Sequence, residues 1–89
     1  MPNTAYKVLT APRAVRDLKK LNQTTLKRID KGILKLTAHP YPPGTRKLIA
    51  SDVAHYRIRI GNYRVLYDVD EQAKSIVILR VGHRRDIYR

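Results

Sequence analysis

Arginine side chains are the groups in this chain that are best arranged for chemistry. In residues 56–67, β-branched and aromatic residues alternate with arginines around Gly61-Asn62, a pair typical of a two-residue hairpin turn. Such a turn sets Arg59 opposite Arg64 and leaves Arg57 on the same face of the hairpin. Like charges that face each other across a ladder destabilise it. We therefore expect this face to bind a polyanion, and phosphate in particular.

Two side chains near the C-terminal end have the chemistry to move a proton. His83 has a side chain that ordinarily titrates near neutrality, so its neutral imidazole can accept a proton. Tyr88 offers a phenol that can serve as a base or as a stacking platform for a nucleobase. Two alternatives remain open: His83 is an inert exposed histidine, and Tyr88 anchors the chain end to the core.

The charge of the chain narrows the class of partner. Lysine and arginine number 19 against 7 aspartate and glutamate residues, a formal net charge of +12 on 89 residues. This excess favours nucleic acid or an acidic protein as partner. With no cysteine and three scattered histidines, we expect neither a disulfide nor a zinc site, and no cofactor. No signal peptide or apolar run of membrane length is evident, so we expect a cytoplasmic protein with no membrane partner.

Apolar periodicity predicts how these residues are positioned. Residues 5–9 alternate like a first strand, and a helix follows from Pro12. Asn22 is a suitable cap for a second helix that ends before Pro40, and the short link predicts an antiparallel helical hairpin. The apolar positions expected to face the core are Ala14, Val15, Leu18 and Leu21 in the first helix, and Leu26, Ile29, Ile33 and Leu36 in the second.

Four strands are expected after a proline-rich crossover at residues 39–44. They cover residues 47–50, 54–60, 62–69 and 75–81. The last is apolar on both faces, as a central strand should be, and the chain then leaves the sheet at Gly82. We assign the tyrosines of the hairpin, Tyr56, Tyr63 and Tyr67, to the core under the helices. The whole chain, residues 1–89, is expected to form one domain.

Two segments carry a resemblance to a known family. The hairpin Tyr-Arg-Ile-Arg-Ile-Gly-Asn-Tyr-Arg-Val-Leu-Tyr and the ending Val-Gly-His-Arg-Arg-Asp-Ile-Tyr, behind two predicted helices, resemble the RelE/ParE superfamily of toxins from bacterial toxin-antitoxin pairs. The resemblance implies an α+β fold in which an N-terminal strand and a two-helix antiparallel hairpin accompany a mainly antiparallel twisted sheet. For the RelE branch it implies a ribosome-dependent endoribonuclease that cuts mRNA in the A site. It also implies an acidic RelB-like antitoxin, bound in a hetero-oligomer.

The resemblance also assigns roles to residues. By its motifs, Arg57 and Arg59 contact RNA phosphates, and Arg64 and Arg84 match arginines of the family's site. Tyr88 matches a tyrosine that packs on or activates the nucleotide. Some members have lysines where this chain has Arg57 and Arg59. A guanidinium stays protonated, so proton transfer must come from other side chains.

These residues suit RNA cleavage by attack of the RNA's own 2'-hydroxyl, which needs cations, a proton acceptor and a proton donor but no metal. The expected catalytic residues are Arg59, Arg64, His83, Arg84 and Tyr88, and the expected RNA-binding residues are Arg57, Arg59 and Arg85. Two other functions remain open. One is a ParE-like inhibitor of DNA gyrase, and the other is an RNA-binding module without catalysis.

Overall fold

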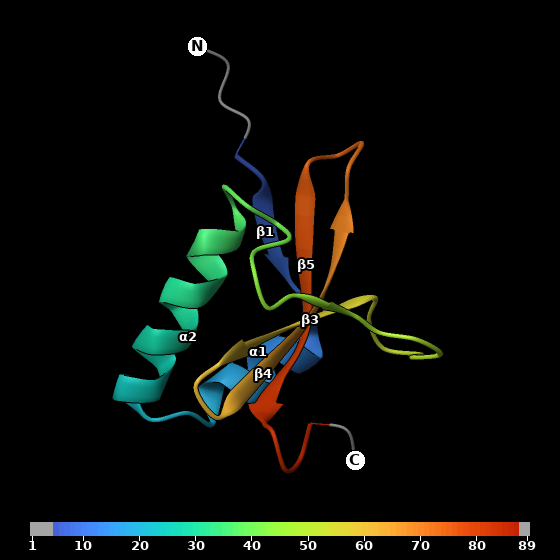
Figure 1. Cartoon of the computed structure of the whole chain (residues 1–89). Coiled ribbons are helices and arrows are strands. Elements are labelled where there is room, and N and C mark those ends of the chain that lie inside the picture. The colour runs from blue at the N-terminus through green and yellow to red at the C-terminus, as the bar shows by residue number, and fades with distance from the viewer. Residues whose placement is uncertain (1–4, 88–89) are drawn as a thin grey trace.

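The computed structural model describes residues 5–87 and has an α+β fold, as the sequence predicts. In chain order the elements are β1 (Lys7–Thr10), α1 (Pro12–Lys19), α2 (Gln23–Leu36), β2 (Arg46–Lys47), β3 (Tyr56–Ile60), β4 (Tyr63–Asp70) and β5 (Ser75–His83). The strands form one sheet in the order β1-β5-β4-β3-β2, in which only β1 and β5 are parallel. The predicted element order and the central place of β5 are confirmed (Figure 1).

The two helices begin where local chemistry favours it. Pro12 occupies the first turn of α1, where its missing N–H costs no hydrogen bond. The Asn22 side chain caps α2 by accepting the backbone N–H of Thr25 at 2.8 Å. Each helix makes its closest contacts with a strand, α1 with β5 and α2 with β3. Val15, expected in the core, is 37% exposed, so the apolar face of α1 is narrower than predicted.

The main core lies between the helices and one face of the sheet. Ile29, Leu36, Ile78 and Tyr67 are fully buried there. The buried Tyr67 hydroxyl donates a hydrogen bond of 2.6 Å to the Pro40 carbonyl, which replaces its hydrogen bond to water. Tyr56 and Tyr63 pack at the edge of the same core, which confirms their predicted place.

A second, smaller core lies on the other face of the sheet, which the helices do not cover. Ala54, Leu66 and Ile87 are buried in it, with Leu48 and Leu79 packed beside them. Ile87 comes from the turn after β5 and Ala54 from the segment before β3. The segment before β3 and the turn after β5 therefore pack together on this face.

A β-bulge interrupts the pairing of β4 with β5. Leu66 pairs with Arg80 and Tyr67 with Ile78, so Leu79 is an extra residue in β5. Because of it, the residues of β5 that face the main core are Ile76 and Ile78 before the bulge, and Val81 and His83 after it. The bulge was not predicted, and the strand continues through Gly82 to His83 rather than ending at residue 81.

The predicted strand at residues 47–50 was placed too late in the chain. β2 contains only Arg46 and Lys47, followed by one more hydrogen bond from Leu48 N–H to the His55 carbonyl at 2.8 Å. Ala50 has a φ of 59°, which a strand cannot accommodate. Neither helix in the described part of the chain has the length and apolar character needed to cross a membrane.

Candidate functional site

Two arginines of the hairpin lie opposite each other on neighbouring strands. Ile60 pairs with Tyr63 around a turn in which Gly61 has a φ of 60°, a conformation that favours glycine. Arg59 consequently pairs with Arg64, as predicted, and Arg64 pairs on its other side with Gly82. The face that carries this pair is the one with the second core, and we call it the arginine face.

The arginines on this face differ in exposure. Arg59 is exposed, and Arg64 is half-buried with its Nη1 donating to the Tyr63 carbonyl at 3.2 Å. Arg57, by contrast, is only 8% exposed. Its position opposite Leu66 explains this difference, because Leu66 belongs to the second core.

The turn after β5 folds back over Gly82. The N–H groups of Asp86 and Ile87 both donate to the His83 carbonyl, at 2.8 and 3.0 Å. This brings Ile87 so close that a Cβ on Gly82 would lie 3.1 Å from the Ile87 Cδ1. Glycine at this position therefore leaves room for the turn on the arginine face beside Arg64.

The basic residues of the turn lie at the end of the hairpin. Arg84 N–H donates to the Asn62 carbonyl at 2.8 Å, which extends the ladder by one bond and fixes Arg84 beside the hairpin turn. The side chains of Arg84 and Arg85 are exposed. Tyr88, the other predicted catalytic residue of this segment, lies outside the described residues.

His83 is not on the arginine face. It pairs with Tyr63, and the two rings meet edge to face with centroids 5.5 Å apart on the helix side of the sheet. Its Nδ1 accepts the Arg85 N–H at 3.2 Å, so the neutral ring carries its proton on Nε2. The structure thus places Arg59 opposite Arg64 and the backbone of Arg84 at the hairpin turn, but the His83 imidazole on the other side of the sheet.

Asp17 supports this site and was missed by the sequence reasoning. Its Oδ2 accepts both Arg80 Nε at 2.8 Å and Val81 N–H at 2.9 Å, and its side chain is 11% exposed. β1 ends at Thr10, so Asp17 satisfies a backbone N–H of β5 beyond the end of its parallel neighbour. The sequence held one signal: Asp17 is the only acidic residue of α1.

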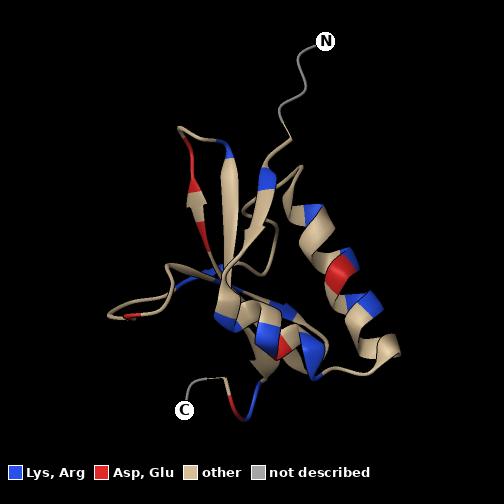
Figure 2. Ribbon diagram, turned by 180° about the vertical axis from the view of Figure 1, so that it is seen from behind, with Lys and Arg blue, Asp and Glu red and all other residues tan. Residues whose placement is uncertain are grey.

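Three of the seven acidic side chains are grouped at the end of the molecule away from this site, and the others are scattered over the helices and loops (Figure 2). Asp68, Asp70 and Glu71 lie at the end of β4 and the turn that follows. Hydrogen bonds from the Tyr41 and Tyr6 hydroxyls hold the pKa of Glu71 below its ordinary value, and burial together with Glu71 raises the pKa of Tyr41. Within residues 5–87, no group of three or more His, Cys, Asp or Glu is placed to hold a metal ion.

Two solved structures with this fold are toxin-antitoxin complexes. The RelBE2 complex of Mycobacterium tuberculosis matches with a TM-score of 0.81 and 32% identity, covering 92% of this chain and 94% of that one. The archaeal RelE-RelB complex of Pyrococcus horikoshii matches with a TM-score of 0.77 and 29% identity, covering 92% and 98%. The fold is therefore that of the RelE toxins, two helices on a mixed five-stranded sheet.

Sequence comparisons agree with the fold. A family model described as the ParE toxin of the type II toxin-antitoxin system parDE matches residues 8–88. Toxin RelG of Mycobacterium tuberculosis is 36% identical over 85 residues, which cover 94% of this chain and 97% of the relative. The putative toxin RelE1 of Methanocaldococcus jannaschii is 34% identical over 80 residues, covering 86% and 88%. The chain belongs to the RelE/ParE family of toxins from type II toxin-antitoxin systems.

Proposed function

We propose that this toxin is a ribosome-dependent endoribonuclease, which cuts mRNA in the A site by attack of the RNA's own 2'-hydroxyl on the adjacent phosphate. The observation that carries the proposal is the row of Arg59 and Arg64 across one ladder, with Arg84 held at its end. The similarity to the RelE-type toxins RelG and RelE1 supports it.

The arginines would stabilise the negative charge that develops on phosphate during the attack. A guanidinium makes bidentate, charge-assisted hydrogen bonds to phosphate oxygens and stays protonated throughout. Exposed Arg59 and Arg84 are free to approach RNA from the arginine face, and Arg85 adds a phosphate contact beside them. Arg57 is 8% exposed, so we assign it to support of the hairpin and a lesser part in phosphate binding.

Proton transfer falls to Tyr88 in this proposal. Arginines cannot accept a proton at neutral pH, and His83 points to the helix side of the sheet. Tyr88 follows Ile87, the last described residue, which lies on the arginine face. Its phenol is the remaining group of the predicted set that can act as acid or base.

An acidic antitoxin is the partner that this proposal requires. The structures of RelBE2 and of the archaeal RelE are complexes with RelB proteins. We infer a RelB-like antitoxin that neutralises the +12 charge of this chain in a hetero-oligomer, and a site of action on cytoplasmic ribosomes.

A ParE-like inhibitor of DNA gyrase is the second candidate, because the matching family model describes a ParE toxin. It would use the same fold without RNA chemistry. The pairing of Arg59 with Arg64 favours the nuclease. Two like charges across a ladder destabilise the sheet, and binding of RNA phosphate explains why they are present, whereas inhibition of gyrase does not require them.

Incubation of the protein with translating ribosomes, followed by mapping of mRNA ends, tests the proposal beside a gyrase supercoiling assay. We expect new mRNA ends within the A-site codon and normal supercoiling. A message with a 2'-deoxy substitution at the cleaved position should remain intact. Blocked supercoiling with intact mRNA would favour the second candidate. Ribosome binding without cleavage would indicate an RNA-binding module.

A further inference from the structure

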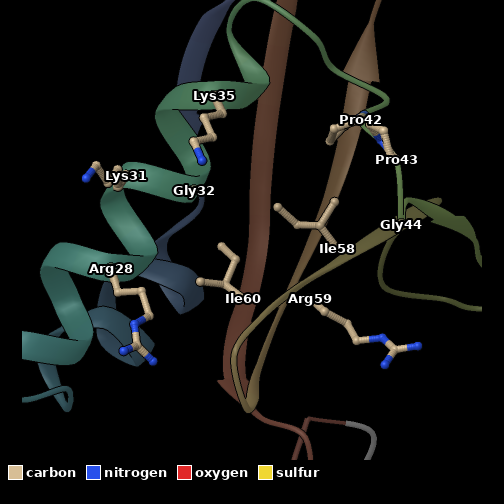
Figure 3. Close-up of a pocket in the computed structure, with 10 residues that line it drawn as sticks. All are labelled: Arg28, Lys31, Gly32, Lys35, Pro42, Pro43, Gly44, Ile58, Arg59 and Ile60. Carbon is tan, nitrogen blue, oxygen red and sulfur yellow. The ribbon is translucent and has the colours of Figure 1, made fainter.

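A groove of about 520 Å³ runs between α2 and the outer edge of β3 (Figure 3). Ile58 and Ile60 point into it from β3, and Pro42 and Pro43 border its far side. α2 approaches β3 closely at Gly32, where a Cβ would clash with Ile60. The floor of the groove is therefore apolar and fixed by a tight contact between helix and strand.

The edge of β3 along this groove has no strand beside it. β2 pairs only with Arg57 and Tyr56, so among the described residues Ile58–Ile60 has no partner strand on this side. Ile60 flanks the two-residue turn and bonds to β4, so the N–H and C=O of the preceding residue, Arg59, point to the open edge. An open edge of this kind is a template for another strand.

The charge around the groove is uniformly positive. Arg28, Lys31 and Lys35 contribute from α2, and no acidic side chain lines the groove. Arg28 reaches the hairpin turn, with its Nη1 3.2 Å from where a Cβ on Gly61 would lie. The Arg59 side chain points away from α2, on the other side of β3 (Figure 3). A strand added at this edge would therefore have cations on both of its faces.

We propose that an extended acidic segment of a protein partner binds here by adding a strand to β3 at Ile58–Ile60. Alternate side chains of that segment would be apolar, on the floor of the groove, and acidic, beside Arg59. The apolar floor and the free backbone groups favour a polypeptide over RNA, which would gain nothing from them. The inference rests on the proposed function only in identifying this partner as the antitoxin.

The probe is a ten-residue synthetic peptide with alternating glutamate and valine, and NMR of the full chain reports its binding. We expect hydrogen exchange at the Arg59 amide to slow about tenfold or more, with no change at Val8 on the opposite sheet edge. The N–H groups of Lys7 and Ala11 donate on the β5 side, so the N–H of Val8 points to the open side of β1. A peptide of the same composition with its valines in one block, and a twelve-nucleotide oligouridylate, serve as competitors that should not protect Arg59.

Charge reversal on the helices provides the matched variants. Arg28→Glu with Lys35→Glu should weaken binding of the alternating peptide about tenfold or more. Arg16→Glu with Lys27→Glu makes the same change of charge on exposed residues outside the groove and should weaken binding less than about threefold.

The outcomes separate this inference from the proposed function. Protection of Val8 in place of Arg59, or equal weakening by both double variants, would overturn the inference. Protection of Arg59 by the oligouridylate but not by the peptide would make the groove an RNA surface. Either result leaves ribosome-dependent cleavage untouched. Conversely, protection of Arg59 by the peptide in a protein that cuts no mRNA would uphold the inference alone. The wild-type measurement decides even if a double variant fails to fold.

Discussion

At the scale of single residues, two neighbouring arginines of β3 have opposite surroundings. Arg57 is 8% exposed beside the second core, whereas Arg59 is exposed. We expect Arg57→Ala to lower the free energy of unfolding by about 1–2 kcal/mol through lost packing of its long side chain. Arg59→Ala should change it by less than about 0.5 kcal/mol yet abolish toxicity. Thermal unfolding and growth arrest measure the two effects, and equal destabilisation would contradict the assignment of Arg59 to function.

The proton-transfer residues can be separated by the same approach. Tyr88→Phe should lower single-turnover cleavage on ribosomes about 100-fold or more, the range of general acid-base catalysis. His83→Gln should lower it less than about tenfold, because the imidazole lies on the helix side of the sheet against Tyr63. Ribosome affinity should stay unchanged in both variants. A larger loss in His83→Gln than in Tyr88→Phe would return the acid-base role to His83.

The residues of the site could be predicted from the sequence to different degrees. A two-residue turn fixes the register on its own, so the pairing of Arg59 with Arg64 follows from Gly61-Asn62. The burial of Arg57 depends on side chains that arrive from elsewhere in the chain, including Ile87. Local patterns contain no information about such long-range contacts, so exposure was predicted less well than pairing.

At the scale of elements, Asp17 joins α1 to the end of β5. Asp17→Ala would leave the Arg80 guanidinium and the Val81 N–H without this carboxylate, in a place where both side chains of the ion pair are at least four-fifths buried. We expect a loss of about 3 kcal/mol in the free energy of unfolding, as for other broken buried pairs. Denaturant unfolding measures it.

A double variant is the control. Asp17→Ala with Arg80→Ala should recover part of the loss, because no unpaired buried charge remains. A single variant as stable as the wild type would show that the ion pair does not hold β5 in place. The double variant also reports whether α1 packs normally without the pair.

The turn between β4 and β5 is joined to two distant segments through Glu71. The carboxylate accepts the Tyr6 hydroxyl and, at 2.6 Å, the Tyr41 hydroxyl, and these bonds lower its pKa. A carboxyl group whose pKa is lower in the folded state than in the unfolded state stabilises the fold at neutral pH. This stabilisation is lost as the pH falls below 4.5, the ordinary pKa of a glutamate, and through the lower pKa of Glu71 in the folded state.

The melting temperature should therefore fall more steeply below about pH 4.5 in the wild type than in Glu71→Gln, which does not titrate. At pH 7 the variant should melt at a lower temperature. Melting curves from pH 3 to pH 7 test this, with Gln72→Ala in the same turn as control. Parallel curves for wild type and Glu71→Gln would show that this carboxylate does not couple folding to pH.

The presence and order of the helices and strands could be predicted from the sequence better than the residues at which they begin and end. Apolar spacing and the Asn22 cap predicted both helices, because these signals are local. The extent of β2 depends instead on the φ of Ala50 and on how far the crossover loop follows β3. The bulge at Leu79 arises from pairing between two strands, so a single strand's alternation could not predict it.

At the scale of the whole molecule, charge is distributed unevenly between a basic hairpin and helices and an acidic end at Asp68, Asp70 and Glu71 (Figure 2). An acidic antitoxin should be attracted to the former, but exposed charge pairs are screened by salt. We expect its affinity to fall about tenfold to 100-fold between low and moderate salt and then level off, because apolar contacts in the groove persist. Titration calorimetry across a salt series measures this, and complete loss of binding would show a contact without apolar anchors.

The extra residue at Leu79 sets the phase of everything that follows it in β5. If all residues of β5 were paired in a regular ladder, Leu79 would lie opposite Leu66 and Arg80 opposite Val65, so that His83 would emerge on the arginine face and Gly82 would face the helices. The bulge takes up the extra residue and keeps the imidazole on the helix side; deletion of Leu79 would leave every later pair as it is now. In this fold one unpaired residue, rather than the order of side chains, decides which residues of β5 become chemical neighbours.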